Sequence, residues 1–318
     1  MKLFSRPVQP AADPLVEKLV RRISADNSVS SDAHCAARLA EAVHAACAHA
    51  RGMVEDLGAP LVLDRTKRTA EAMGPILFDS RADAVDALRG ASRVRQVFAA
   101  PGVRECFFLL TMHRREYVVF GTEMEGEVVR RDVMQDAVEF RDHNFSAAAP
   151  SLAELRDMLT ENVVLFLAGL ATRRLNRDEA LRAHMHQSEA LLRAQMQTLD
   201  RALRESGPFA AQAALQDRAS AAGREMRELR DRLSSLPAKS DPEQCLQEIR
   251  EVLHAPQRYV RLERVEMRVG DFGVKSAAGK PVSFHECVLG DEDRLAVIMA
   301  SMDRDNALYL WPDLAAPA

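Results

Sequence analysis

Three residues with reactive side chains alternate along one short segment of the chain. Glu139, Arg141 and His143 lie at every second position, with Phe140 between the first two. If the segment is a β-strand, the three polar side chains share one face and Phe140 points to the core. A carboxylate, a guanidinium and an imidazole on one face can bind an anion or transfer protons. We take these three as the candidate catalytic residues, although the solvent-exposed face of a half-buried strand gives the same pattern.

The histidines and cysteines do not form a recognisable metal motif. Of the 9 histidines and 5 cysteines, one predicted helix carries His34, Cys35, His44, Cys47 and His49. Only His44 and Cys47 have a helical spacing that lets two side chains share a metal ion, and a second pair of ligands is not identifiable. The glycine-rich phosphate-binding and dinucleotide-binding motifs and the G-x-S-x-G nucleophile motif are also missing. We therefore predict no metal and no cofactor.

The composition excludes several classes of protein. Of 318 residues, 47% are hydrophobic and 5% aromatic, and 43 basic residues stand against 47 acidic ones, for a net charge of −4. Nucleic acid is not an expected partner, because phosphate binding needs a basic excess. A membrane is not expected either, because the most apolar stretch, residues 163–171, is far shorter than the ~20 residues of a membrane helix. Scattered cysteines and an N-terminus without an apolar signal segment predict a cytoplasmic protein.

The pattern of the chain changes three times. Residues 1–57 show the spacing of apolar residues that is typical of helices, and residues 58–150 alternate short apolar runs with turn residues. Residues 151–256 are helical in pattern throughout, and residues 257–318 return to the alternation of β-strands. We predict four segments with these boundaries. The last segment either forms a small meander of its own or joins the sheet of the second segment, with the third segment as an insertion.

Within the second segment we expect a helix and an antiparallel meander. The helix is predicted from about residue 80 to residue 98. Residues 106–112 and 117–120 are rich in β-branched and aromatic side chains, and the polar residues 113–116 between them predict the turn of a β-hairpin. Two shorter strands are expected after a turn at Gly126.

The clearest pattern is a heptad repeat in the third segment. Apolar and small residues recur at alternating intervals of four and three and form the predicted interaction seam: Leu215, Ala219, Ala222, Met226, Leu229, Leu233 and Leu236. A similar alternation runs from Leu181 to Ala202, and Gly207 and Pro208 separate the two stretches. Two such helices joined by a short break predict an antiparallel, coiled-coil-like hairpin. The break favours pairing within the hairpin, and pairing with another chain is the alternative.

Together these features predict an α+β, helix-rich fold in which the helical hairpin is flanked by two small antiparallel β segments. The heptads favour a non-enzymatic interaction protein, a scaffold or adaptor that self-associates or binds a protein partner through helix faces. One alternative is a small-ligand sensor, in which the sheet of residues 104–143 signals through the helix that starts at Ser151. The other is an enzyme whose unrecognised site adds His285 or Glu286 to the candidate catalytic residues.

Overall fold

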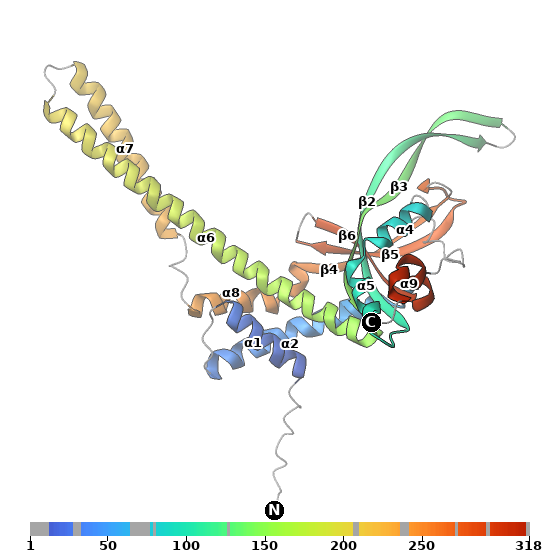
Figure 1. The fold of residues 1–318 in the computed structure, drawn as a ribbon. Coiled ribbons are helices and arrows are strands. Elements are labelled where there is room, and N and C mark those ends of the chain that lie inside the picture. Colours follow the sequence, from blue (N-terminus) through green and yellow to red (C-terminus); the bar gives the residue numbers. More distant parts are fainter. Residues whose placement is uncertain are drawn as a thin grey trace, which may run out of the picture. The chain divides into compact units, whose positions relative to one another are not determined.

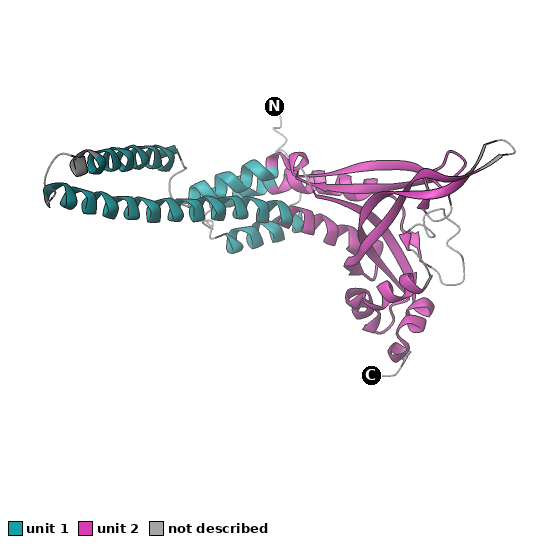
Figure 2. Cartoon of the chain, turned by 90° about the horizontal axis from the view of Figure 1, so that it is seen from above, with its two compact units in different colours: residues 1–42, 166–253 teal, residues 43–165, 254–318 magenta. Residues whose placement is uncertain are grey.

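The computed structural model describes residues 13–27, 33–63, 77–78, 81–125, 128–205, 210–235, 242–270, 273–290 and 293–315. The fold is mixed α+β, as predicted, and divides into two compact units (Figure 2). The helical unit holds the residues up to 42 and residues 166–253, and the sheet unit holds residues 43–165 and 254–318. Helices α2 (Ala33–Asp56) and α6 (Leu152–Glu205) contribute residues to both.

The helical unit also contains α1 (Pro14–Asp26), α7 (Ala210–Ser235) and α8 (Pro242–His254) (Figure 1). Helix α8 begins at a proline, where the missing backbone N–H would have no helical partner in any case. Three helices meet at Asn27, because the Thr172 hydroxyl of α6 donates to its side chain and Cys245 Sγ of α8 lies 3.6 Å from its backbone oxygen. Among the helices that the structure describes, none is long and apolar enough to cross a membrane.

A six-stranded sheet organises the second unit. Its order is β3-β2-β6-β5-β4, and the short β1 (Leu61–Val62) pairs in parallel with the end of β6. The other strands are β2 (Glu105–Glu125), β3 (Val128–Ala149), β4 (Val260–Val269), β5 (Lys280–Leu289) and β6 (Asp293–Asp303). Because β6 pairs antiparallel with β2, the strands before and after the helical block form one sheet. The prediction of two small flanking β segments is wrong, since local patterns do not reveal this long-range pairing.

One face of the sheet carries the larger hydrophobic core. Phe108 and Leu110 of β2 pack there with helices α4 (Arg81–Arg89), α5 (Ser92–Ala99) and α9 (Arg304–Leu310). On the same face the rings of Phe140 and Phe284 meet edge to face, with 5.2 Å between their centroids. In place of the single helix predicted over residues 80–98, the structure has two helices, α4 and α5. They separate at Gly90, a residue of low helix propensity.

The opposite face of the sheet supports the start of α6. Ala147 and Ala149 of β3 pack against Leu155 and Leu159 of this helix. A capping box at Ser151 begins this helix, because the Glu154 N–H donates to Ser151 Oγ at 3.3 Å and the hydroxyl donates to the Glu154 carboxylate at 3.0 Å. Small alanine side chains on the strand let the helix lie close to the sheet.

The sheet curls so that residues 273–275, between β4 and β5, reach the far edge strand β3. Val274 forms an antiparallel bridge with Ala137, and the Lys275 N–H donates to the Asp136 oxygen at 2.7 Å. The same segment also returns to β4, because Lys275 bridges Val269. The two edges of the sheet are thus joined through one short connection, which encloses the larger core.

The predicted hairpin turn at residues 113–116 is wrong. Strand β2 continues through these residues to Glu125, and its antiparallel partner β3 begins at Val128. Sequence alone suggests a turn here because the residues are charged. In the structure Arg114 and Glu116 both have charged partners, so a strand accommodates them.

Candidate functional site

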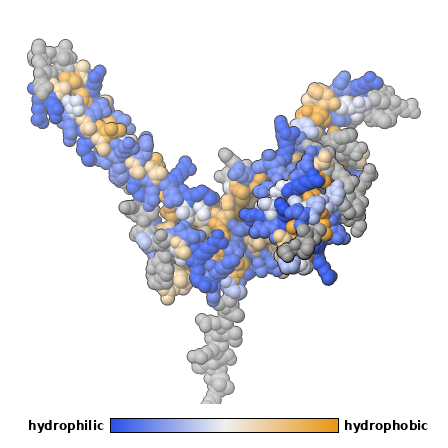
Figure 3. All heavy atoms as spheres, in the orientation of Figure 1, coloured by the Kyte–Doolittle hydropathy of each residue, from blue (hydrophilic) through white to orange (hydrophobic). Residues whose placement is uncertain are grey.

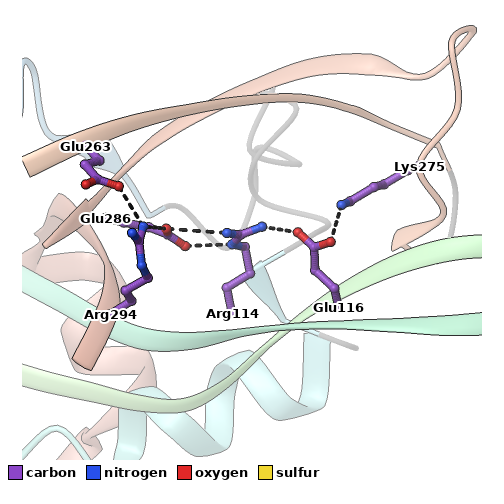
Figure 4. Close-up of polar contacts among 6 residues, drawn as sticks. All are labelled: Arg114, Glu116, Glu263, Lys275, Glu286 and Arg294. Atoms are coloured by element: carbon purple, nitrogen blue, oxygen red, sulfur yellow. Dashed lines mark hydrogen bonds and ion pairs between the residues drawn. The ribbon is translucent and has the colours of Figure 1, made fainter. Parts of the chain in front are cut away.

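Six charged side chains form a cluster on the face of the sheet that carries the larger core (Figure 4). The cluster consists of Arg114, Glu116, Glu263, Lys275, Glu286 and Arg294. Side chains two positions apart in a strand lie on the same face of a sheet. Arg114 follows the core residue Met112 by two positions, and Glu286 follows the core residue Phe284 by two positions. The cluster therefore continues the apolar core as a polar layer.

Glu286 is the buried centre of this cluster, with only 3% of its side chain exposed. Arg114 donates to it twice, from Nε to Oε1 at 2.6 Å and from Nη2 to Oε2 at 3.4 Å. In the β4–β5 ladder Glu286 lies directly opposite Glu263, an arrangement that would be repulsive without a cation. Arg294 Nη1 supplies that cation, at 2.6 Å from Glu263 Oε2 and 3.4 Å from Glu286 Oε2.

The exposed end of the cluster ties the 273–275 segment to β2. Glu116 pairs with Arg114 and accepts a 2.6 Å hydrogen bond from Lys275 Nζ. The hydrogen bond from Lys275 lowers the pKa of Glu116, and the hydrogen bonds from Arg294 and Arg261 lower the pKa of Glu263. Each carboxylate in the cluster is held by at least one cation, so the arrangement is suited to holding strands together rather than to transferring protons.

The three candidate catalytic residues do not share a face. Asp142 has a positive φ of 56°, and the β2–β3 ladder gains an extra β3 residue between Thr111 and His113. This β-bulge rotates His143 away from its two neighbours. Its Nε2 lies 2.5 Å from the Leu77 oxygen and its ring stacks on Phe78.

Glu139 and Arg141 remain together on the other side of the bulge. Arg141 Nε lies 2.7 Å from Glu139 Oε1, and Arg115 of β2 lies 3.5 Å from the same atom. The alternation that predicted one catalytic face is thus interrupted at a single residue, Asp142. A three-residue acid–base group does not form here.

A polar cavity of about 320 Å³ lies beside His143. Its lining includes Ser92, Arg93, Asn144 and Ser146, and Arg93 Nη1 donates to the Ser146 oxygen at 2.8 Å. A cavity of this size can hold a small polar molecule. It is the place where the predicted ligand sensing by the sheet of residues 104–143 would occur, and that role stays a prediction.

Two thiols of the sheet unit, those of Cys106 and Cys287, are poor nucleophiles. Burial raises the pKa of Cys106 to about 12 and that of Cys287 to about 11. None of the five cysteines, all of which lie among the described residues, forms a disulfide. The predicted His44 and Cys47 pair gains no further ligands, because the described residues contain no group of three or more metal-binding side chains. His49 instead places Nε2 at 2.9 Å from the Val260 oxygen.

His285, a further candidate from the sequence, makes stability depend on pH. Burial and then the nearby Arg264 lower its pKa below the ordinary 6.5, while Asp56 opposes the shift. The unfolded chain then binds more protons than the folded chain between the lowered pKa and 6.5, so stability is lost as pH falls through this window. We expect His285→Gln to flatten the dependence of the unfolding free energy on pH between 5 and 7. Urea unfolding at several pH values measures it, and an unchanged dependence would contradict the assignment.

The long helices α6 and α7 expose apolar side chains. They lie side by side (Figures 1 and 2), and Arg230 Nε of α7 reaches Glu189 Oε1 of α6 at 3.2 Å. Of the predicted interaction seam, only Ala222 and Met226 are buried among the described residues, and Leu236 and the break at residues 207–208 lie outside them. On α6, Leu181 and Leu191 are 44% and 67% exposed.

A second apolar surface lies on the outer half of the β2–β3 hairpin. We call residues 113–125 of β2 and 128–141 of β3 the ribbon. Val118, Phe120 and Met134 are 50%, 72% and 68% exposed on it, and Phe120 lies directly opposite Met134. Figure 3 shows hydrophobic residues gathered on this part of the molecule. Such exposed side chains are typical of interaction surfaces.

Comparison with models of known protein families, with curated proteins and with solved structures finds no match to this chain. The function must therefore be inferred from the residues themselves. They provide a charge cluster in which each carboxylate is paired, a separated set of candidate catalytic residues and two exposed apolar surfaces.

Proposed function

We propose that the protein is a non-enzymatic interaction protein, a scaffold or adaptor, that associates with itself through helices α6 and α7. The apolar stripe that these helices leave partly exposed carries this proposal. A cytoplasmic location is part of the proposal and is supported by the five described cysteines, none of which forms a disulfide.

The stripe lies on the part of α6 that follows Leu175. Among residues 176–204 no side chain is buried, although Met185, Leu192, Met196 and Leu199 are shielded in part. These four recur at helical intervals of three, four and seven and so follow one side of the helix. One neighbouring helix therefore covers this side incompletely.

A second copy of the same two helices would complete the packing. Helices in proteins gain most of their stability by burying an apolar face against a neighbour, and two helices provide only one such contact. Two pairs related by a two-fold axis form a four-helix bundle, in which the exposed Leu181 and Leu191 would be covered as well. The heptad spacing of α7 suits this packing.

The experiment is a measurement of molar mass by size-exclusion chromatography with light scattering, at tens of micromolar protein. We expect the wild type to associate and Leu181→Glu/Leu191→Glu to weaken association by about tenfold or more, because a loss of 1.4 kcal/mol is tenfold in affinity. Both leucines are exposed in the single chain, so the substitutions leave its own packing unchanged.

Ala183→Glu/Ala190→Glu is the matched control. It adds the same charges to exposed positions on the side of α6 opposite the partly shielded stripe and should leave the mass unchanged. A wild type that stays monomeric, or equal weakening by the two variants, would contradict the proposal.

A further inference from the structure

We propose that the ribbon is a second interface, at which the outer edge of β2 pairs with the same edge of a second copy of this chain. The two strands would run antiparallel about a two-fold axis at Val119. The result is a continuous sheet in the order β3-β2-β2-β3. This interface is independent of the helical surface, because it uses other residues and backbone hydrogen bonds.

The outer edge of β2 is open after Met112. The last residue of β2 that pairs with β6 is Met112, opposite Ala296. Beyond it, β3 is the strand that pairs with β2 among the described residues, so the N–H and C=O groups on the outer side of β2 lack a strand partner there. Unpaired edges of this kind are templates for another strand.

The outer edge of β3, in contrast, is disrupted. Each of the three register shifts in the ladder places the extra residue in β3, so β2 is the regular strand. Asp132 and Asp142 have positive φ angles of 59° and 56°, which bend the β3 edge. Residues 273–275 cover it further at Asp136 and Ala137. Bulges and covering segments are how proteins block unwanted pairing, and this ribbon has them on one edge only.

The sequence of β2 is complementary to itself. With the axis at Val119, Val118 of each copy lies opposite Phe120 of the other copy. The exposed apolar residues of the two ribbons then form one continuous surface. In this register position 115, an arginine, is paired with position 123, a glutamate, at each end of the pairing. Residues 117–120, Tyr-Val-Val-Phe, are uncharged and have high β propensity.

The charge cluster holds this edge in place. Arg114 is bound to Glu286 and Glu116 is bound to Lys275, and these two β2 residues precede the uncharged run. An edge that is already ordered loses less entropy on pairing than a flexible one. The cluster thus has a role in the proposed interface without touching the second copy.

A cysteine at the axis tests the geometry directly in the full-length chain. In Val119→Cys the two thiols would face each other at the 4.5–5.5 Å Cα spacing of opposite residues, which a disulfide can bridge. We expect mild oxidation to give a covalent dimer on a non-reducing gel. Met134→Cys is the control, because β3 of one copy and β3 of the other are separated by three strand spacings, or about 14 Å.

Charge substitution tests the affinity. Val118→Lys/Phe120→Lys places lysines opposite each other across the interface and should lower the molar mass, whereas Val62→Lys, at another exposed valine of the sheet unit, should not. The Val119→Cys dimer should persist when Leu181→Glu/Leu191→Glu is added, which separates this interface from the helical one. Equal cross-linking at positions 119 and 134, or an unchanged mass of the double-lysine variant, would overturn the proposal.

Discussion

Replacing Glu286 with glutamine is expected to lower the free energy of unfolding of the sheet unit by about 3 kcal/mol, because removing one member of a buried ion pair leaves its partner without a countercharge. Glu286 is 3% exposed and accepts hydrogen bonds from Arg114 and Arg294. An amide cannot neutralise two guanidinium groups. Urea unfolding followed by the fluorescence of Trp311, the only tryptophan and a member of the larger core, measures the effect.

Two variants identify the cause of this loss. Glu263→Gln should have a much smaller effect, because Glu263 is 37% exposed and water replaces its contacts. Arg114→Met/Glu286→Leu should be more stable than Glu286→Gln, because it removes both charges and fills the space with apolar atoms. If Glu286→Gln unfolds at the wild-type urea concentration, the cluster contributes nothing to stability.

The sequence predicts those features that depend on neighbouring residues. The capping box that begins α6 at Ser151 and the proline that begins α8 both depend on residues within one helical turn. The coiled-coil packing of α6 and α7 depends on contacts between helices, and it stays a prediction. Local signals therefore identify helices better than they identify what the helices pack against.

The charged run in β2 shows why the sheet was harder to predict. Residues 113–116 resemble a turn because a strand with four consecutive polar residues rarely buries a face. The partners that accommodate them, Glu286 and Lys275, are more distant in the sequence than any periodicity analysis reaches. In the sequence, the open edge of β2 is indicated only by the uncharged run Tyr-Val-Val-Phe at residues 117–120. A central strand has the same pattern, so the run does not reveal an edge.

The separation of the candidate catalytic residues has an equally local cause. Strand alternation placed Glu139, Arg141 and His143 on one face, and the bulge at Asp142 broke the alternation. Aspartate is among the few residues that tolerate a positive φ, so the residue type gave a weak signal. A bulge is nevertheless hard to predict from one sequence, because most aspartates in strands do not adopt this conformation.

The connection that joins the two sheet edges depends on a glycine, and Gly273→Ala is expected to destabilise the sheet unit by about 3 kcal/mol. Gly273 has a φ of +78°, and a Cβ atom there would lie 2.3 Å from the Val138 backbone oxygen. The segment must then move away from β3, which breaks the bridge between Val274 and Ala137 and opens the larger core. Urea unfolding followed by Trp311 fluorescence again provides the measurement.

Gly58→Ala is a closely matched control for this prediction. Gly58 also has a φ of +78° and belongs to the same unit, but nothing lies within 4 Å of the position of its Cβ. Gly58→Ala should therefore lower the free energy of unfolding only by the cost of the left-handed conformation, about 1 kcal/mol. The difference between the two variants isolates the contact with Val138 from the backbone preference. Equal losses would mean that residues 273–275 are not held tightly against β3, and that the two edges of the sheet are joined more loosely than the backbone contacts indicate.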